Sequence, residues 1–330
     1  SSISVSDAAS DAARWGRLLW RYAAITLAAG LLLGMLALVL DPYDTGRLSL
    51  LPAYGVADFG PRLASASIAR RPAVDAAIFG NSTVQLLDPA RLSRLSGRNF
   101  VSLAVPGTGP VEQLALAAFF QRHHPAGPVL VFGIDASWCT TDDPIKLAHP
   151  FPFWLYSANR FDYAVNMMRY KSFEAVLRRL KLLAGYGRMA RPDGYRDYDT
   201  GNPWHLPEFR EPAAPVTAAG TQAVTTDDFT APPLLRQFLA RLDIGARVVL
   251  VMPPQHAKAL PPSDSLAAAS LDVCKEAYRR LAGARPDTKW LDFLRDGPIA
   301  RQAENFWDAI HYRSPVAREI EDRLAGALKR

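Results

Sequence analysis

The chain carries its hydrophobic residues in two kinds of run, one long and several short. The long run, residues 22–40, holds 19 residues without a charge. As a helix it would extend about 28 Å, which is enough to cross the hydrocarbon of a bilayer. It ends Leu38-Val39-Leu40-Asp41, without the small-residue pattern of a signal-peptide cleavage site, and it is longer than a signal-peptide core. The pattern therefore predicts one retained N-terminal transmembrane helix.

Charges on either side of this segment predict its orientation. Arg14, Arg17 and Arg21 precede it, whereas Asp41 and Asp44 follow it. Because positively charged flanks stay on the cytoplasmic side, we expect a single span in the inner (cytoplasmic) membrane with a cytoplasmic N-terminus. The main domain would then be periplasmic or extracellular.

Small residues inside the span form a candidate contact surface. Gly30 and Gly34 are four residues apart, with Ala23 and Ala37 near the same face. Such a groove lets a second helix backbone approach closely, although glycine and alanine are also common in membrane helices without that role. The Gly30/Gly34 face is therefore a candidate site for another subunit of a membrane complex.

The short runs are apolar at consecutive positions and are bounded by turn residues. Continuous runs of this kind are typical of parallel strands that are covered on both faces, and segments with apolar residues three and four apart lie between them. This alternation predicts an α/β fold, a three-layer α/β/α sandwich with a mainly parallel, flavodoxin-like sheet. The predicted strands are 76–79, 100–105, 129–132, 248–252 and 290–293, and the predicted helices include 111–121, 266–281 and 315–328.

An interval of about 110 residues, 138–245, separates the third and fourth predicted strands and is too long for an ordinary connection. It predicts an insertion. Its first half is an amphipathic helical pattern with Phe173, Val176, Leu177 and Leu180 on one face; its second half, 192–233, holds seven prolines and is typical of an irregular loop. The expected organisation is a cytoplasmic segment at 1–21, the span at 22–40, a linker at 41–73 and one domain at 74–330.

The net charge of +6 matters mainly through its distribution. Residues 160–191 hold eight Lys or Arg residues against Asp162 and Glu174. A basic amphipathic cluster in a membrane-tethered protein fits anionic headgroups or an acidic glycan, and a solvated helix face is the plainer interpretation. The eight are Arg160, Arg169, Lys171, Arg178, Arg179, Lys181, Arg188 and Arg191.

Cysteine and histidine usage excludes several classes of site. With only Cys139 and Cys274, a disulfide scaffold and a cysteine-rich zinc site are excluded, and one long-range bridge is left open. His123-His124 has no acidic or cysteine companion at metal-ligand spacing, so we expect no metal. The chain holds no phosphate loop, dinucleotide fingerprint or nucleic-acid module, so we expect no cofactor and no nucleic-acid partner.

A serine follows the first predicted strand, in Phe79-Gly80-Asn81-Ser82-Thr83. Ligands of open α/β sheets bind beyond the carboxyl ends of the strands, which is where this turn lies. Gly80 allows a tight turn, and Ser82 would open the next helix with its hydroxyl at the sheet edge. Such a serine can attack an acyl carbon while its own amide holds the oxyanion, although a serine at this position is more often only a helix cap.

A base and a carboxylate precede the last predicted helix, in Asp308-Ala309-Ile310-His311. An aspartate and a histidine three residues apart can face the same way. His311 can then take the Ser82 proton while Asp308 fixes the histidine tautomer and stabilises the imidazolium. Each pattern is weak alone, and the two together predict a Ser82-His311-Asp308 triad.

These two turns resemble the SGNH (GDSL-like) hydrolase superfamily over about residues 74–328, in particular its membrane-anchored branch of DltD-like and polysaccharide O-acyltransferase accessory proteins. Residues 99–107 are similar to that family's second block, where a glycine amide contributes to the oxyanion hole. The resemblance therefore implies that Gly107 joins the Ser82 amide as a donor.

The chain departs from the family pattern at two positions. The aspartate that usually precedes the serine is Asn81 here, which is not the triad acid. The third block, often Gly-x-Asn-Asp, places Asp135 after the third strand. At the oxyanion asparagine's position an ionised Asp135 would repel the oxyanion, and otherwise it would hydrogen-bond a neighbouring loop. His256, after the fourth strand, would contact substrate or, more plainly, be a satisfied loop histidine.

We therefore expect a membrane-anchored serine O-acyltransferase or acylesterase of cell-envelope glycan or lipid esters. An integral membrane acyltransferase would deliver the acyl donor, and an envelope polysaccharide would accept it. The alternative is a non-catalytic accessory subunit of a membrane complex, which Asp135 and the long insertion favour and the three triad residues disfavour. The distance between Ser82 and His311 separates the two.

Overall fold

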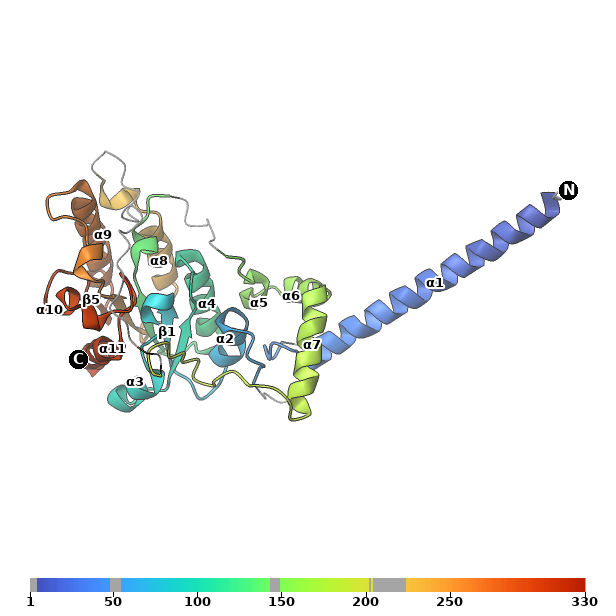
Figure 1. Ribbon diagram of the computed structural model, residues 1–330, viewed down its shortest axis with the longest axis horizontal. Helices are drawn as coiled ribbons and strands as arrows, with labels where there is room; N and C mark the ends of the chain where they lie inside the picture. Colours follow the sequence, from blue (N-terminus) through green and yellow to red (C-terminus); the bar gives the residue numbers. More distant parts are fainter. Residues whose placement is uncertain (1–4, 48–54, 143–148, 202, 204–223, 330) are drawn as a thin grey trace. The chain divides into compact units, whose positions relative to one another are not determined.

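The computed structural model describes residues 5–47, 55–142, 149–201, 203 and 224–329 (Figure 1). Contacts divide the chain into two compact units. The anchor unit combines Ser1–Tyr54 with Asn159–Gly187, and the α/β unit combines Gly55–Ala158 with Arg188–Arg330. The insertion expected at 138–245 is thus divided between the two units.

The α/β unit is built on a five-stranded parallel sheet. Its order, β2-β1-β3-β4-β5, is the flavodoxin-like order, so the predicted fold class is confirmed. Residues in the three strands β1 to β3 are buried throughout, which explains why they read as continuous apolar runs. The strands are β1 (Ala76–Gly80), β2 (Phe100–Ala104), β3 (Val129–Gly133), β4 (Arg247–Met252) and β5 (Thr288–Asp292).

Helices cover both faces of the sheet (Figure 1). Alternate strand residues such as Ile78 and Val131 pack in one core with residues of α11, while Phe79 and Phe132 face α4 and α8 on the other side. The larger helices are α2 (Pro61–Ala69), α3 (Pro89–Ser96), α4 (Pro110–His123), α8 (Ala231–Leu239), α9 (Leu266–Gly283) and α11 (Ser314–Lys329). The short ones are α5 (Phe153–Tyr156), α10 (Pro298–Arg301), η1 (Ser82–Val84), η2 (Ala136–Cys139), η3 (Thr226–Asp228), η4 (Ala257–Ala259) and η5 (Ala303–Asn305).

The chain that returns from the insertion covers the edge of the sheet at β2. The Ser102 amide donates to the carbonyl of Asp193 at 2.7 Å, and Gly194 follows with a φ of +71°. A Cβ at residue 194 would overlap the Ser102 carbonyl, so only glycine allows this approach. Part of the predicted irregular stretch 192–233 therefore protects an edge strand, while residues 202 and 204–223 lie outside the described part of the chain.

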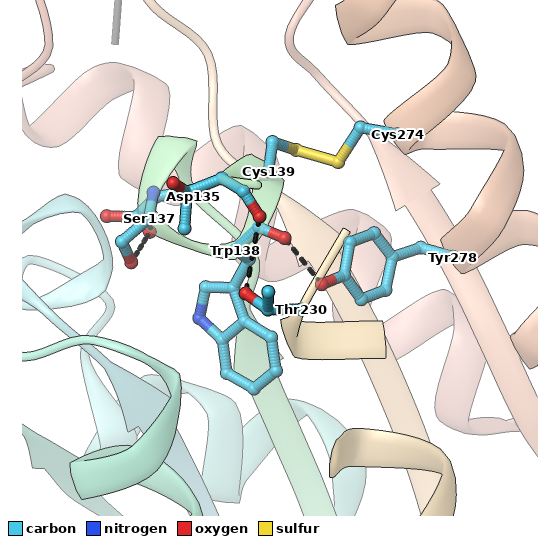
Figure 2. Close-up of a disulfide and its surroundings, with 8 residues drawn as sticks. Asp135, Ser137, Trp138, Cys139, Thr230, Cys274 and Tyr278 are labelled. Atoms are coloured by element: carbon cyan, nitrogen blue, oxygen red, sulfur yellow. Dashed lines mark hydrogen bonds between the residues drawn. A yellow bond between two sulfur atoms is a disulfide. The ribbon is translucent and has the colours of Figure 1, made fainter. Parts of the chain in front are cut away.

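A disulfide joins Cys139 in η2 to Cys274 in α9 (Figure 2). Beside it lies Trp138, which is fully buried. The Trp138 indole donates to Gln113 Oε1 at 3.0 Å, and its carbonyl accepts a hydrogen bond from the Tyr278 hydroxyl at 2.8 Å. The bridge that the sequence left open is formed, and it fastens the turn after β3 to a helix on the sheet.

The anchor unit contains α1 (Val5–Leu40), α6 (Arg160–Met167) and α7 (Tyr170–Leu183). Within α1, Arg14–Leu40 is long and apolar enough to span a membrane. The Asp41 carboxylate, buried at the end of α1, accepts hydrogen bonds from the Tyr163 hydroxyl at 2.7 Å and the Thr45 hydroxyl at 3.0 Å. Buried polar contacts therefore hold the α6–α7 hairpin against the end of this helix.

The apolar face predicted for the first half of the insertion is only partly buried. Val176 is buried, but Leu177 and Leu180 are 61% and 41% exposed. The side chains of α7 that are buried differ in size, from Ala175 to the large, fully buried Arg179. The buried residues are Ser172, Ala175, Val176, Arg179 and Leu182. One of the eight basic residues of this segment is therefore not on the surface. Arg179 is buried beside Asp44, with 3.8 Å between Arg179 Nη2 and Asp44 Oδ1.

The Gly30/Gly34 face is partly occupied by the same chain. Gly34 is buried, and a Cβ there would overlap the sulfur of Met168. A Cβ at Gly30 would meet no described atom within 4 Å. The Gly34 half of the small-residue groove thus receives the end of α6, while the Gly30 half is open.

Candidate active site

The turn after β1 places Ser82 at the carboxyl edge of the sheet. The Asn81 side chain caps this turn, because its Oδ1 accepts hydrogen bonds from the Thr83 amide at 3.0 Å and the Thr83 hydroxyl at 2.9 Å. Gly80 and Gly133 leave room for Val84, whose methyl groups would overlap a Cβ at either glycine. Local packing therefore explains why the chain turns sharply here and begins η1 with Ser82.

The loop between η5 and α11 carries the other two triad candidates. An antiparallel bridge between Phe306 and Tyr312, both fully buried, closes this loop at its base. Inside it, the Trp307 amide donates to the His311 carbonyl at 2.8 Å. The loop is therefore short and anchored on both sides, and it presents Asp308 and His311 toward the sheet edge.

Ser82, His311 and Asp308 form one hydrogen-bonded chain. His311 Nε2 lies 2.8 Å from Ser82 Oγ, and His311 Nδ1 lies 2.7 Å from Asp308 Oδ2. The other Asp308 oxygen accepts the amides of Ile310 at 2.9 Å and His311 at 2.8 Å. The structure thus brings together three residues that lie up to 229 positions apart in the sequence.

The charge of Asp308 determines which nitrogen of His311 carries the proton. Burial acts to raise the pKa of Asp308, but hydrogen bonds from the His311 ring and from the amides of Ile310 and His311 outweigh it, and the pKa lies below its ordinary value. Asp308 is therefore a carboxylate at neutral pH and accepts the proton on His311 Nδ1. This leaves Nε2 as the acceptor for the Ser82 hydroxyl.

Ser82 and Gly107 each contribute a backbone amide to the turns at this edge. The turn after β2 lies beside the turn after β1, because the Val105 amide donates to the Gly80 carbonyl at 2.9 Å. Gly107, with a φ of +66°, belongs to that turn. Among the described residues, the amides of Ser82 and Gly107 donate no hydrogen bond to another protein atom. Both can therefore serve as donors to a ligand.

Asp135 hydrogen-bonds the neighbouring loops. Its Oδ2 accepts from the Asn81 side-chain amide, and its Oδ1 accepts from the Ser137 amide at 3.0 Å and the Ser137 hydroxyl at 2.6 Å. Burial raises the pKa of this carboxyl despite those bonds. Of the two arrangements expected for Asp135, this is the one in which the carboxyl supports a neighbouring turn.

His256 lies behind the triad loop and is buried. Its Nδ1 accepts the Lys258 amide at 3.1 Å, and its ring meets the Phe306 ring edge-on at 5.6 Å. Its backbone amide donates to the Ala309 carbonyl at 3.0 Å. Burial, and then the charge of Lys258, lower the pKa of this histidine. The contacts place His256 as a support of the 308–311 turn.

Sequence reasoning missed two residues that pack on this loop, Tyr198 and Asp199. The Tyr198 ring meets the His311 ring edge-on at 5.9 Å, and its hydroxyl donates to the Tyr312 carbonyl at 2.9 Å. Asp199 accepts hydrogen bonds from the Trp307 indole at 2.7 Å and from Arg313 Nε at 3.0 Å. Both residues come from the proline-rich half of the insertion, where no local pattern distinguishes them from loop residues.

The described residues contain no group of three or more His, Cys, Asp or Glu side chains that could hold a metal ion.

No protein-family model and no curated protein matches the chain. Among solved structures, the chain is similar to a protein from Streptococcus pneumonia that is described provisionally as a platelet activating factor. The two are 12% identical, the alignment covers 93% of this chain and 97% of the other, and the TM-score is 0.34.

Proposed function

We propose that this chain is a membrane-anchored serine O-acyltransferase or acylesterase of SGNH type. The observation that carries the proposal is the continuous chain from Ser82 Oγ through the His311 ring to Asp308, with contacts of 2.8 Å and 2.7 Å. A serine in this arrangement is activated by a base whose tautomer is fixed by a carboxylate. The resemblance of the two sequence blocks to the SGNH superfamily supports the same assignment.

The reaction begins with attack of Ser82 Oγ on the carbonyl carbon of an acyl ester. The Ser82 proton passes to His311 Nε2, and Asp308 stabilises the resulting imidazolium. The amides of Ser82 and Gly107 donate to the tetrahedral oxyanion. Collapse breaks the bond to the leaving alcohol, which takes the proton from His311 and leaves the acyl group as an ester on Ser82.

The second half returns the enzyme to its starting state. An acceptor hydroxyl gives its proton to His311 Nε2 and attacks the Ser82 ester, and Ser82 then leaves and regains the proton. A glycan hydroxyl as acceptor completes a transfer, and water completes a hydrolysis. Both outcomes use the same three residues, so the acceptor that reaches the ester decides between them.

Two features support action on cell-envelope esters. Arg14–Leu40 is able to hold the α/β unit at a membrane, where a donor delivered by an integral membrane acyltransferase has a high effective concentration. The Cys139–Cys274 disulfide is typical of proteins on the exported side. An intramembrane partner would use the Gly30 side of α1, because Met168 covers Gly34.

Labelling with a fluorophosphonate serine probe tests this proposal. We expect covalent labelling of the full chain in detergent, and loss of labelling in Ser82→Ala and in His311→Ala. Ser96→Ala removes a serine at the end of α3 whose hydroxyl donates to the Leu92 carbonyl, and it serves as the matched control that keeps labelling. A folded wild-type chain that takes no label contradicts a competent triad and favours the non-catalytic accessory subunit.

A further inference from the structure

The α6–α7 hairpin exposes large apolar side chains. On α6, Phe161 is 74% exposed and Val165 is 48% exposed; on α7, Tyr170 and Leu177 are 83% and 61% exposed. All of them belong to the anchor unit, together with α1. A contiguous apolar surface of this kind on a folded unit marks a contact with something other than water.

Helical geometry sorts the side chains of α7 into three strips. At 100° per residue, the buried residues of α7 follow one strip, and Tyr170, Leu177 and Leu180 follow a second. The third strip is basic and exposed, and it holds Lys171, Arg178 and Lys181 together with Glu174. Glu174 pairs with Arg178 at 2.6 Å. An apolar strip flanked by cations is the pattern of a helix that lies in a membrane interface.

Contacts with α1 fix the level of the hairpin along the predicted span. Met168, at the end of α6, fills the space beside Gly34, which is six residues before Leu40. At 1.5 Å per residue, that contact lies about 9 Å inside the end of the apolar segment. The buried pairs Tyr163 with Asp41 and Arg179 with Asp44 hold the hairpin at this level.

We infer that the α6–α7 hairpin lies in the bilayer interface, with Phe161, Leu177 and Leu180 among the acyl chains and the cations at anionic headgroups. The contacts of the hairpin with the α1 segment run from Gly34, inside the span, to Asp41 and Asp44, just past its end, and this is the level of the bilayer interface. An acidic glycan would match the basic strip but would leave the apolar strip unexplained. The partner is therefore an anionic lipid surface, and the chain has a second membrane attachment beside its helix.

Depth measurement in vesicles tests this inference. The full chain is reconstituted into phosphatidylcholine vesicles with and without phosphatidylglycerol, and a spin label is placed at Leu177→Cys. Ile244→Cys is the matched control, because Ile244 is also apolar and exposed, at 83%, and lies in the α/β unit. Both native cysteines are in the disulfide and take no label.

Power saturation with oxygen and with a water-soluble nickel chelate reports the depth of each label. We expect the label at 177 to collide several-fold more with oxygen than with nickel, and the label at 244 to show the reverse. Lys171→Gln with Lys181→Gln should reduce the immersion of the 177 label only when phosphatidylglycerol is present. Equal access of nickel to the labels at 177 and 244 overturns the inference. A label at 177 that is shielded in native membranes but not in vesicles also overturns it, because the apolar strip would then contact a protein partner. An immersion that ignores lipid charge overturns the assignment to anionic headgroups.

Discussion

The side-chain amide of Asn81 donates a hydrogen bond to the carboxylate of Asp135, and this contact joins the turn after β1 to the turn after β3. The same Asn81 side chain accepts from the Thr83 amide with its oxygen. Asp135 therefore holds Asn81 in the orientation that caps the Ser82 turn. The sequence predicts that Asp135 either repels an oxyanion or bonds a neighbouring loop, and in the structure it supports the turn that carries Ser82.

Asp135→Asn should lower the rate of fluorophosphonate labelling by about 10- to 100-fold, because both carboxylate oxygens accept from amide donors, those of Asn81 and Ser137, and asparagine can accept from only one of them. The unpaired donor should also reduce the free energy of unfolding by about 1–3 kcal/mol. Labelling kinetics and urea denaturation of the full chain measure the two effects. A faster rate in Asp135→Asn would instead mean that the carboxylate repels the oxyanion.

Asp308→Asn should abolish most activity while the fold persists. An asparagine amide would donate toward His311 Nδ1 and favour the tautomer that cannot accept the Ser82 proton, a change that costs about 10⁴-fold in a serine protease triad. Hydrolysis of a soluble acyl ester at neutral pH measures the loss, and circular dichroism checks the fold. Near-normal turnover in this variant would show that Asp308 does not orient the base.

Tyr198 is a positioning residue for His311. Tyr198→Phe keeps the ring against His311 and loses only the bond to the Tyr312 carbonyl, so it should cost about 1 kcal/mol of unfolding free energy and little rate. Tyr198→Ala removes the ring and should slow labelling by up to about 100-fold. Rate and stability are measured on the same samples, and a parallel loss of both in the two variants would mean that the residue acts on stability alone.

Asp199 should make stability depend on acidic pH. Burial acts to raise its pKa, but hydrogen bonds from Ser314, Arg313 and Trp307 outweigh it, and the pKa is lowered. A lowered folded-state pKa contributes stability that is full above the ordinary aspartate pKa of about 4 and is lost as the pH falls through the folded value. The difference in unfolding free energy between wild type and Asp199→Asn should therefore be largest at pH 7 and shrink toward pH 3. A difference that is independent of pH would contradict this role.

Removing the disulfide should destabilise the α/β unit without touching the triad. The bridge closes a loop of 135 residues, and the double variant Cys139→Ala with Cys274→Ala should lose about 2–4 kcal/mol of unfolding free energy. Thermal denaturation of the variant, and of wild type with a reductant, should agree. A wild-type melting temperature that does not respond to the reductant would contradict this contribution.

The sheet was predictable because most of its strands are covered on both faces. Most predicted strands are continuous apolar runs in the sequence, and the observed order β2-β1-β3-β4-β5 is that of the predicted flavodoxin-like sheet. The turns that carry Ser82 and His311 were found for a similar reason, since both directly adjoin these regular elements. Local sequence therefore predicted the layers and the edge of the sheet where the site lies.

The supports of the site were not predictable in the same way. Tyr198 lies 113 positions before His311 in an irregular segment, and only the folded chain brings the two rings to 5.9 Å. The amphipathic pattern of α7 groups Val176 with Leu177 on one face, but Val176 is buried whereas Leu177 is exposed. A hydrophobic pattern alone cannot distinguish a protein core from a lipid surface.

The order of synthesis has a consequence for this triad. Ser82 is made 229 residues before His311. At about 5–20 residues per second, the serine exists for roughly 10 to 50 s before its base leaves the ribosome. Until then Ser82 lacks its hydrogen-bond partner His311, so on the proposed mechanism a nascent or C-terminally shortened chain carries the serine without its base.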